Sequence, residues 1–569
     1  MPVASCTWIF IPHNNCFFLE YFISKESFIS KNGGFDSSLH SREEASSTSD
    51  ADFFEVKEGQ KFVFISEDDL KETADVSFAV ETPVLENDKA FVIGEAEWEG
   101  RFSIYHNAMY DSEMKTYFIY YRCMHRSADL EEDGLTFNEK KATCVVTSQD
   151  GIHFERPELS IFPDANGEST NIIGKGSSFH NLMVFRSAGR EGEKKYMAIG
   201  GAHGVTKSDS GVYLFGSNDA IHFEKLKETP ILTEADDISH ELPSHFDSLN
   251  TVAWDKFRHI YWIWARTNAK SDSKEVVWRQ EQVYVMDDIL SGKHLPATLT
   301  TYDNKRNYQH YTTCVSLVPM AEGSSYFVGF PNPYPLYGSS LAMSRNGKQF
   351  RHPLGLDVEY VPDPFVDTRG SPNYENYSYR QCCVPGVVPS PDGTRWYFYQ
   401  YVSLHHYATP RQAGENVGFL RAYSIPNWGF TYVHSEEGHF FTKPMIVTAS
   451  FPGKRASLHF MARRMSKDKD QSQVSSSISF QLYHYSNLKQ STQAKQAYST
   501  EKANKLLWSS GPCPVNEHDD SVREYDVNSE SKLKLVTALS SIPLDEKTFI
   551  VWKITLRHAA LHGFWMYDD

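Results

Sequence analysis

The chain has 569 residues, which exceeds one ordinary domain and predicts two or three. Its 73 acidic and 56 basic residues give a formal charge of −17, which excludes the basic footprint of a nucleic-acid-binding protein and disfavours anionic lipid as a partner. Aromatic residues make up 14% of the chain, a content that favours strands and suits a surface on which sugars stack.

Residues 1–54 are expected to form an N-terminal extension, partly disordered, with no function that the sequence reveals. The apolar stretch at 6–23 is interrupted by Pro12 and Glu20 and has no basic segment before it, so it is a poor signal peptide. No stretch approaches the roughly 20 apolar residues that span a bilayer. We therefore expect no integral membrane segment, and the cytoplasm is slightly favoured over secretion.

The eight cysteines show neither a Cys-x-x-Cys pair nor the Cys/His spacing of a metal site. Their scattered positions are interpreted as reduced thiols, with a disulfide-bonded chain as the alternative. The sequence predicts no metal and no redox cofactor.

Short runs of aromatic and β-branched residues, bounded by turn residues, begin after the extension. Clear examples are the runs at 115–122, 259–266 and 395–401. Such runs are typical of strands, and long amphipathic helices are hard to find. The fold class predicted is all-β.

One turn motif recurs along the chain, at Ser148–Phe154, Ser217–Phe223 and Ser344–Phe350. The first two copies are 69 residues apart (217 − 148), and the third follows after 127 (344 − 217), close to two such periods. Its central Asp or Asn suits a tight hairpin, and its final aromatic residue can pack beneath a neighbouring unit. We interpret these turns as structural.

A second repeat consists of a polar cluster followed by an apolar strand, a turn and an aromatic strand. The clusters begin near 105, 180, 247, 311 and 380, with offsets of 75, 67, 64 and 69. Five units of this size predict a five-bladed β-propeller over residues 55–433, with the polar clusters converging on the channel. One or two β-sandwiches are the alternative, but they do not explain five evenly spaced units.

The pattern changes after about residue 433. Strand-like runs continue to the end of the chain without the turn motif, so residues 434–569 are predicted to form a β-sandwich.

Several segments resemble glycoside-hydrolase-like five-bladed propeller proteins related to glycoside hydrolase families 32 and 43. The resemblance covers roughly residues 60–569. It is carried by Trp98-Glu99-Gly100, His180-Asn181, Phe246–Asn250, Trp428-Gly429-Phe430 and the segment 557–564. It implies a propeller, with the appended β-sandwich of family 32. The chain departs from the group at Ser187, where an Asp is usual, and it lacks the aspartate signatures and the Glu-Cys pair of family 32.

Glycoside hydrolysis needs two carboxyl groups across the scissile bond. Asp247 is the only carboxylate within the five polar clusters and is the candidate nucleophile or base; the alternative is an Asp that caps backbone donors. Glu99, beside Trp98, is the candidate acid, or else a surface residue next to a Trp that closes the propeller. Glu375, in a Tyr-rich loop, is the second candidate acid, or else a solvated loop residue.

The remaining polar residues of the clusters are candidates for sugar binding. Arg380 would hold an acidic sugar, Tyr311 would stack on a ring, and the others would meet hydroxyl groups. Alternatively, these side chains merely line a wet channel. The candidates are His106, His180, Asn181, Asn250, Tyr311, Arg380 and His405.

Together these features predict a glycoside hydrolase acting on an unidentified oligo- or polysaccharide. A non-catalytic carbohydrate-binding or interaction propeller is the rival from another class, because a fold does not prove an activity. Glycosyl transfer or phosphorolysis is a third possibility. The sugar, the stereochemistry and the oligomeric state stay open.

Overall fold

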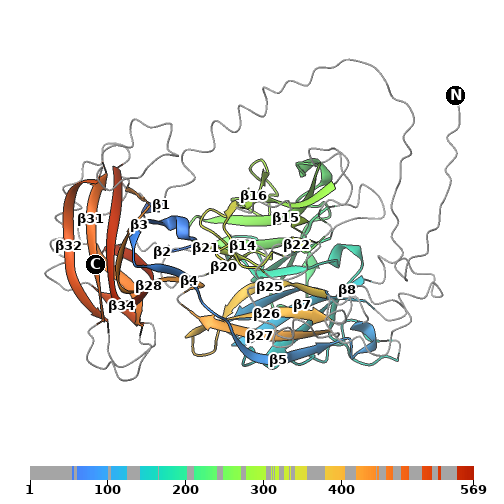
Figure 1. The fold of residues 1–569 in the computed structure, drawn as a ribbon. Helices are drawn as coiled ribbons and strands as arrows, with labels where there is room; N and C mark the ends of the chain where they lie inside the picture. The colour runs from blue at the N-terminus through green and yellow to red at the C-terminus, as the bar shows by residue number, and fades with distance from the viewer. Residues whose placement is uncertain are drawn as a thin grey trace, which may run out of the picture.

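The structure is a computed structural model in which a propeller lies beside a C-terminal sheet (Figure 1). Among the described residues, no helix has the length and apolarity needed to cross a membrane. The structure describes residues 54–56, 61–99, 104–124, 141–164, 166–201, 211–239, 246, 248–270, 277–302, 309–310, 312, 314–318, 326–331, 333–334, 340–354, 379–403, 418–427, 429–443, 445–447, 456–465, 476–485, 503–515, 523–526 and 548–568.

Five antiparallel sheets form the blades of a five-bladed β-propeller, which confirms the fold predicted from the repeats. Blade 1 contains β6 (Ile104–Asp111), β7 (Thr116–Met124), β8 (Lys141–Ser148) and β9 (Ile172–Lys175). Blade 2 contains β10 (Met183–Arg186), β11 (Tyr196–Gly200), β12 (Tyr213–Ser217) and β13 (Glu224–Lys225). Blade 3 contains β14 (Thr251–Asp255), β15 (Ile260–Lys270), β16 (Val277–Met286) and β17 (Thr298–Leu299). Blade 4 contains β20 (Ser316–Val318), β21 (Tyr326–Gly329) and β23 (Ala342–Ser344), and blade 5 contains β25 (Tyr379–Pro389), β26 (Arg395–Ser403), β27 (Gly418–Pro426) and β5 (Val84–Ile93).

The first strand of each blade is its inner strand, and these five strands close into a ring. β6 contacts β10, β10 contacts β14, β14 contacts β20, β20 contacts β25, and β25 returns to β6. Blade 5 takes its outermost strand, β5, from the N-terminal side of the propeller, where Ile93 pairs with Gly418. Two ends of the propeller segment are therefore joined by hydrogen bonds within one blade.

The recurring turn bonds its own backbone amides in a similar way in blades 1, 2 and 4. In blade 1, the Gly151 amide donates to Ser148 Oγ (2.9 Å), and the Ile152 amide donates to Asp150 Oδ1 (2.8 Å). In blade 4, Ser344 and Asn346 accept the same two bonds, from Gly347 and Lys348. In blade 2, Ser217 Oγ accepts from the Asp219 amide (3.2 Å), and Asp219 accepts from the Ile221 amide (3.0 Å). The motif thus satisfies its own backbone donors locally.

A hydrogen bond that the sequence did not reveal connects this turn to the preceding blade. An aromatic side chain on the second strand of that blade donates to the carbonyl of the residue after the Asp or Asn. Tyr399 donates to Gly151 (2.8 Å), Tyr120 to Ala220 (3.0 Å) and Trp264 to Gly347 (2.8 Å). We call these three bonds the blade latches.

The second part of the molecule is an 11-stranded hydrogen-bonded network centred on β34. Phe460 and Phe480 pack with their rings 5.2 Å apart, and Trp552 and Phe564 from β34 share the same core. The division of this part into the two layers of a sandwich stays a prediction. The network contains β1 (Phe54–Val56), β2 (Phe62–Val63), β3 (Leu70–Ala74), β4 (Ser77–Val80), β28 (Thr431–Thr442), β29 (Met445–Val447), β30 (Ala456–Arg464), β31 (Ser476–Tyr485), β32 (Ala503–Val515), β33 (Arg523–Asp526) and β34 (Thr548–Asp568).

Strands β1–β4 hydrogen-bond within this network, whereas the sequence pattern predicts that residues from 55 onward belong to the propeller. A buried ion pair joins the two parts here: Arg345, in the turn of blade 4, bonds both oxygens of Asp69 (3.0 and 2.8 Å). Arg345 Nη2 also donates to the Val63 carbonyl (2.6 Å). Burial alone would raise the pKa of Asp69, but Arg345 and Lys443 outweigh it and hold that pKa below its usual range.

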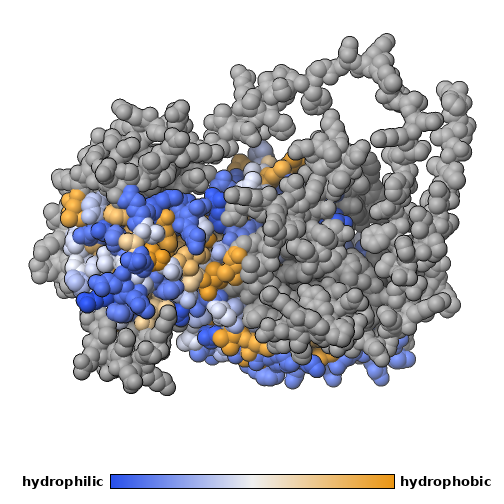
Figure 2. Space-filling model, viewed as in Figure 1, coloured by the Kyte–Doolittle hydropathy of each residue, from blue (hydrophilic) through white to orange (hydrophobic). Residues whose placement is uncertain are grey.

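Short elements complete the described part of the chain. The large exposed apolar residues Leu295 and Leu506 lie far apart in the sequence, and Figure 2 shows hydrophilic and hydrophobic residues interspersed on the described surface of the C-terminal sheet. The short elements are the 3-10 turns η1 (Glu67–Asp69), η2 (Glu97–Glu99), η5 (Ser177–Phe179) and η7 (Glu234–Asp236), and the two-residue strands β18 (Thr301–Tyr302), β19 (Gln309–His310), β22 (Pro333–Tyr334) and β24 (Gln349–Phe350).

The interpretation of the cysteines as reduced thiols is wrong for at least two of them. Cys123 in β7 and Cys144 in β8 form a disulfide. The strand register pairs Cys144 with Tyr121 and Cys123 with Ala142, so the two cysteines are diagonal neighbours. A spacing of 21 residues does not reveal this proximity, because it depends on where the β7–β8 hairpin turns. Cys513 is buried, and its thiol donates to the Gly511 carbonyl (3.9 Å).

Candidate functional site

The inner strands begin at one end of the propeller, which we call the head end, with an unusual backbone. A residue with positive φ stands at the head of four of them: Tyr105 (59°), Asn181 (55°), Phe246 (57°) and Cys314 (50°). In blade 1 the pairing shifts register between Ile104 and Asn107, so the chain bulges there. Bulges of this kind redirect side chains and are frequent beside active sites.

His106 lies within the bulge of blade 1 and is 2% exposed. Its ring lies between the rings of Tyr121 and Tyr401, with centroids at 5.5 and 4.7 Å. Burial and the nearby Arg122 lower the pKa of His106 to about 3, so its imidazole is neutral at physiological pH. Neither ring nitrogen has a hydrogen-bond partner among the described residues.

Asn181, at the head of β10, is also buried, and both polar atoms of its amide lack a partner within the described part of the chain. His180, beside it, is 4% exposed and caps η5. Asn250 precedes β14 and bonds to the backbone: its amide donates to the Phe246 carbonyl (3.2 Å) and its oxygen accepts from the Arg266 amide (3.2 Å). His106 and Asn181 thus have free hydrogen-bonding capacity that Asn250 has used in shaping its own strand head.

Glu99 ends the turn η2, just before blade 1, and its side chain is fully buried. Arg156 bonds both of its oxygens (2.9 and 2.8 Å), the Tyr121 hydroxyl donates to one oxygen, and the Gly94 amide donates to the other (2.8 Å). Every oxygen is therefore occupied by the protein. This enclosure leaves no face on which Glu99 could meet a substrate.

Trp98 belongs to the same network. Its indole donates to Asn171 Oδ1 (2.7 Å), and the Asn171 amide donates to the Tyr121 hydroxyl (2.9 Å), which in turn bonds Glu99. The contacts connect η2 to strand β7 and to the residue that precedes β9. The sequence does not reveal Arg156 and Tyr121 as partners of Glu99, because they lie 57 and 22 residues further along the chain.

Two other buried carboxylates at the head end of blade 3 were also missed. Asp237 accepts from the Ser239 amide (2.7 Å) and the Thr267 hydroxyl (2.6 Å). Glu281, on β16, accepts from the Tyr302 hydroxyl (3.1 Å). No motif in the sequence distinguishes these residues from the many other acidic ones.

The remaining predicted site residues cannot be placed. Asp247, Glu375, Tyr311 and His405 lie outside the described residues. Of Arg380 only the backbone is described, where it pairs with Val402 in β25. The roles assigned to these five residues stay predictions. Within the described ranges, no group of three potential metal ligands occurs.

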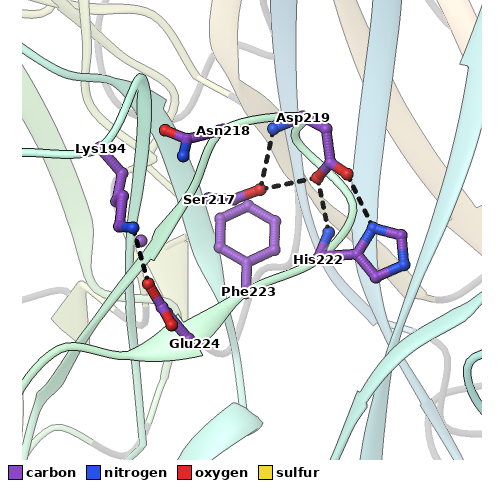
Figure 3. Close-up of a pocket in the computed structure, with 8 residues that line it drawn as sticks. Lys194, Ser217, Asn218, Asp219, His222, Phe223 and Glu224 are labelled. Atoms are coloured by element: carbon purple, nitrogen blue, oxygen red, sulfur yellow. Dashed lines mark hydrogen bonds and ion pairs between the residues drawn. The ribbon is translucent and has the colours of Figure 1, made fainter.

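A pocket with a volume of about 370 Å³ lies at the opposite end of the propeller, on blade 2 (Figure 3). Lys194 comes from the turn between β10 and β11, and the other lining residues come from β12, its turn and β13. The sequence did not predict a binding pocket here, although the repeated turn forms part of it. The lining residues are Lys194, Gly216, Ser217, Asn218, Asp219, His222, Phe223 and Glu224.

No family model and no curated protein matches the chain. Among solved structures, it is similar to a family 43 arabinoxylan arabinofuranohydrolase from Bacillus subtilis in complex with cellotetraose (9% identity, TM-score 0.36, covering 86% of this chain and 99% of that one). It is also similar to a fructofuranosidase from Schwanniomyces occidentalis with fructosylnystose (10%, 0.33, 89% and 99%). A third is an exo-β-1,3-galactanase from Phanerochaete chrysosporium with β-1,3-galactotriose (8%, 0.32, 86% and 100%). At these identities the likeness concerns the fold, and no functional argument rests on it.

Proposed function

We propose that this protein is a glycoside hydrolase whose active site lies at the head end of the inner strands and whose substrate is an oligo- or polysaccharide. The observation that carries the proposal is the pair formed by His106 and Asn181. Both are buried, both head inner strands of adjacent blades, and both offer polar atoms with no partner among the described residues. Sugar hydroxyl groups donate and accept, so they match a neutral imidazole and an amide.

Asp247 supplies one carboxylate in this proposal, as nucleophile or base. It follows Phe246, whose positive φ interrupts the regular alternation of side chains at the head of β14. For the acid, the enclosure of Glu99 favours the second candidate, Glu375. Tyr311, Arg380, His180, Asn250 and His405 contribute to sugar binding, and the reaction needs no redox cofactor. The Cys123–Cys144 disulfide supports an oxidising compartment over the cytoplasm.

Three variants of the full chain test the catalytic assignment: Asp247→Asn, Glu375→Gln and Glu99→Gln. Hydrolysis is measured on chromogenic glycosides and on neutral polysaccharides. We expect the first two to lose about 10²–10⁴-fold in kcat/KM, the usual contribution of an acid or base. Unchanged hydrolysis by Asp247→Asn contradicts the proposal.

A non-catalytic carbohydrate-binding propeller is the second candidate. It is favoured by the three buried carboxylates described at the head end: Glu99, Asp237 and Glu281 all accept hydrogen bonds from the protein itself. Saccharide binding without hydrolysis by the unmodified chain selects this candidate.

A further inference from the structure

The pocket on blade 2 belongs to neither the head end nor the proposed catalytic residues. Inner strand β10 runs away from the head end, so the β10–β11 turn with Lys194 and the β12–β13 turn with Asp219 both lie at the far end. The volume of about 370 Å³ falls within the range of small-ligand sites, about 300–1,000 Å³. The two ends could therefore hold separate ligands.

The copy of the turn in blade 2 differs from the copies in blades 1 and 4 at two positions that line or border the pocket. The final aromatic residue is buried in blade 1 (Phe154, 7% exposed) and in blade 4 (Phe350, 1%), whereas Phe223 is only partly buried. The residue before the serine is Thr147 in blade 1 and Met343 in blade 4, but Gly216 in blade 2.

Gly216 leaves room that a side chain would take. A Cβ atom there would lie 2.6 Å from Cγ of Lys194 and 3.0 Å from Cδ1 of Leu226. The stem of Lys194 can therefore lie close to β12, where it forms one wall of the pocket. A side chain at this position would push Lys194 away from β12 and change this wall of the pocket.

The lining combines an aromatic ring with polar groups on both sides. Figure 3 shows the Phe223 ring between two polar pairs: the ion pair of Lys194 with Glu224 (2.9 Å) and the hydrogen bond between His222 and Asp219 (2.7 Å). Asn218 is exposed on the rim. The C–H face of a sugar ring packs on an aromatic ring, and its hydroxyls bond to carboxylates, amides and ammonium groups.

The charged side chains that line the pocket favour neutral sugars over acidic ones. Burial alone would raise the pKa of Asp219, but hydrogen bonds from His222 and Ile221 outweigh it and lower the pKa to about 2, so this group is a carboxylate at neutral pH. With Glu224 also negative and Lys194 the one permanent cation of the lining, the pocket repels anionic ligands such as uronates and phosphates.

We propose that the pocket formed by Lys194, Gly216, Asn218, Asp219, Phe223 and Glu224 is a second binding site, specific for neutral saccharides. It stands on its own residues and does not require the proposed hydrolase activity.

Isothermal titration of the full chain tests this proposal. The probes are xylotetraose, cellotetraose and laminaritetraose, with tetragalacturonate as the anionic comparison, each up to ~10 mM so that a millimolar Kd is detected. Two variants alter the pocket: Gly216→Thr introduces the residue of blade 1, and Phe223→Leu removes the ring but keeps an apolar side chain. Gln149→Ala, at the position in blade 1 that corresponds to Asn218, is the matched control.

We expect at least one neutral tetraose to bind, with affinity lowered about tenfold or more in both pocket variants and unchanged in Gln149→Ala. Thermal unfolding of each variant confirms that it is folded. The proposal is overturned if no neutral probe binds, if both folded pocket variants bind as the unmodified chain does, or if tetragalacturonate binds best. Asp247→Asn leaves this pocket intact. If that variant loses hydrolysis but still binds the tetraose, the two proposals are shown to concern different sites.

Discussion

Glu99 illustrates how far the surroundings of one residue decide its role. Its neighbour Trp98 suggests an aromatic platform for a sugar with an acid beside it. In the structure, however, the Trp98 indole donates to Asn171. The Glu99 carboxylate accepts hydrogen bonds from Arg156, Tyr121 and Gly94. A buried carboxylate that holds a guanidinium is costly to replace, because its removal leaves the cation without its partner.

We therefore expect Glu99→Gln to lower the free energy of unfolding by about 3 kcal/mol. Chemical denaturation measures this change. The control is Glu97→Gln, an exposed residue of the same turn, for which the change should stay within about 0.5 kcal/mol. A Glu99→Gln variant of normal stability with no hydrolysis would show that Glu99 is catalytic after all.

His106 predicts a pH dependence of stability. The unfolded chain binds this proton near pH 6.5, whereas the folded chain does not bind it until about pH 3. The contribution of His106 to the free energy of unfolding is therefore fully present above pH 6.5 and is lost progressively as the pH falls towards 3. At pH 5 the loss is about 2 kcal/mol.

His106→Phe removes this titration and keeps a ring between Tyr121 and Tyr401. The loss of stability between pH 7 and pH 5 should be about 2 kcal/mol smaller in the variant than in the unmodified chain. Denaturant unfolding at both pH values measures it. Burial also lowers the pKa of His562, but this residue is present in both chains, so its contribution cancels in the comparison. Equal losses in the two chains would contradict the prediction.

At the scale of strands and turns, the blade latches join neighbouring blades at equivalent points. Each uses an aromatic side chain on a second strand and a carbonyl in the next turn. Tyr399→Phe leaves the Gly151 carbonyl without its donor and should cost about 1–2 kcal/mol of unfolding free energy. Thermal and denaturant unfolding check this value. Tyr110→Phe, for whose hydroxyl no hydrogen bond is described, should change stability by less than about 0.5 kcal/mol.

The sequence predicts the turns but not the blade latches, because the turns bond within a few residues and the latches join residues far apart in the chain. Ser148, Asp150 and Gly151 bond within four residues, so the motif itself contains the interaction. Tyr399 lies 248 residues from Gly151, and its aromatic run looks like any other.

The strand heads escaped prediction for another reason. Tyr105, Phe246 and Cys314 adopt positive φ, which their residue types seldom do, so no local sequence preference predicts this backbone conformation. The regular alternation of side chains along a strand therefore does not predict which face Asp247 occupies. The even spacing of the polar clusters nonetheless located the heads of β6, β10 and β14.

At the scale of the whole molecule, Arg345 couples the propeller to the C-terminal sheet. It bonds Asp69 through both oxygens and lies 4.6 Å from the centroid of the Phe62 ring. Arg345→Met leaves a buried carboxylate beside Lys443 alone and should lower the free energy of unfolding by about 3 kcal/mol.

Calorimetry checks this coupling, because two parts that separate should melt in two transitions instead of one. Lys348→Met, in the same turn, is the control and should keep a single transition. A single unshifted transition in Arg345→Met would show that the apolar contacts between Ile65, Phe330 and Phe430 suffice to hold the parts together.

The position of β5 also has a consequence for biosynthesis. Its partner β27 is made 325 residues later (418 − 93), which takes on the order of half a minute at ~10 residues per second. β2 waits even longer, for β34 at the very end of the chain. Blades 1–4 can assemble on the ribosome, but the emerging chain carries an unsatisfied β5 edge throughout. We infer that a nascent chain stalled before residue 418 exposes that edge and is the species most at risk of aggregation.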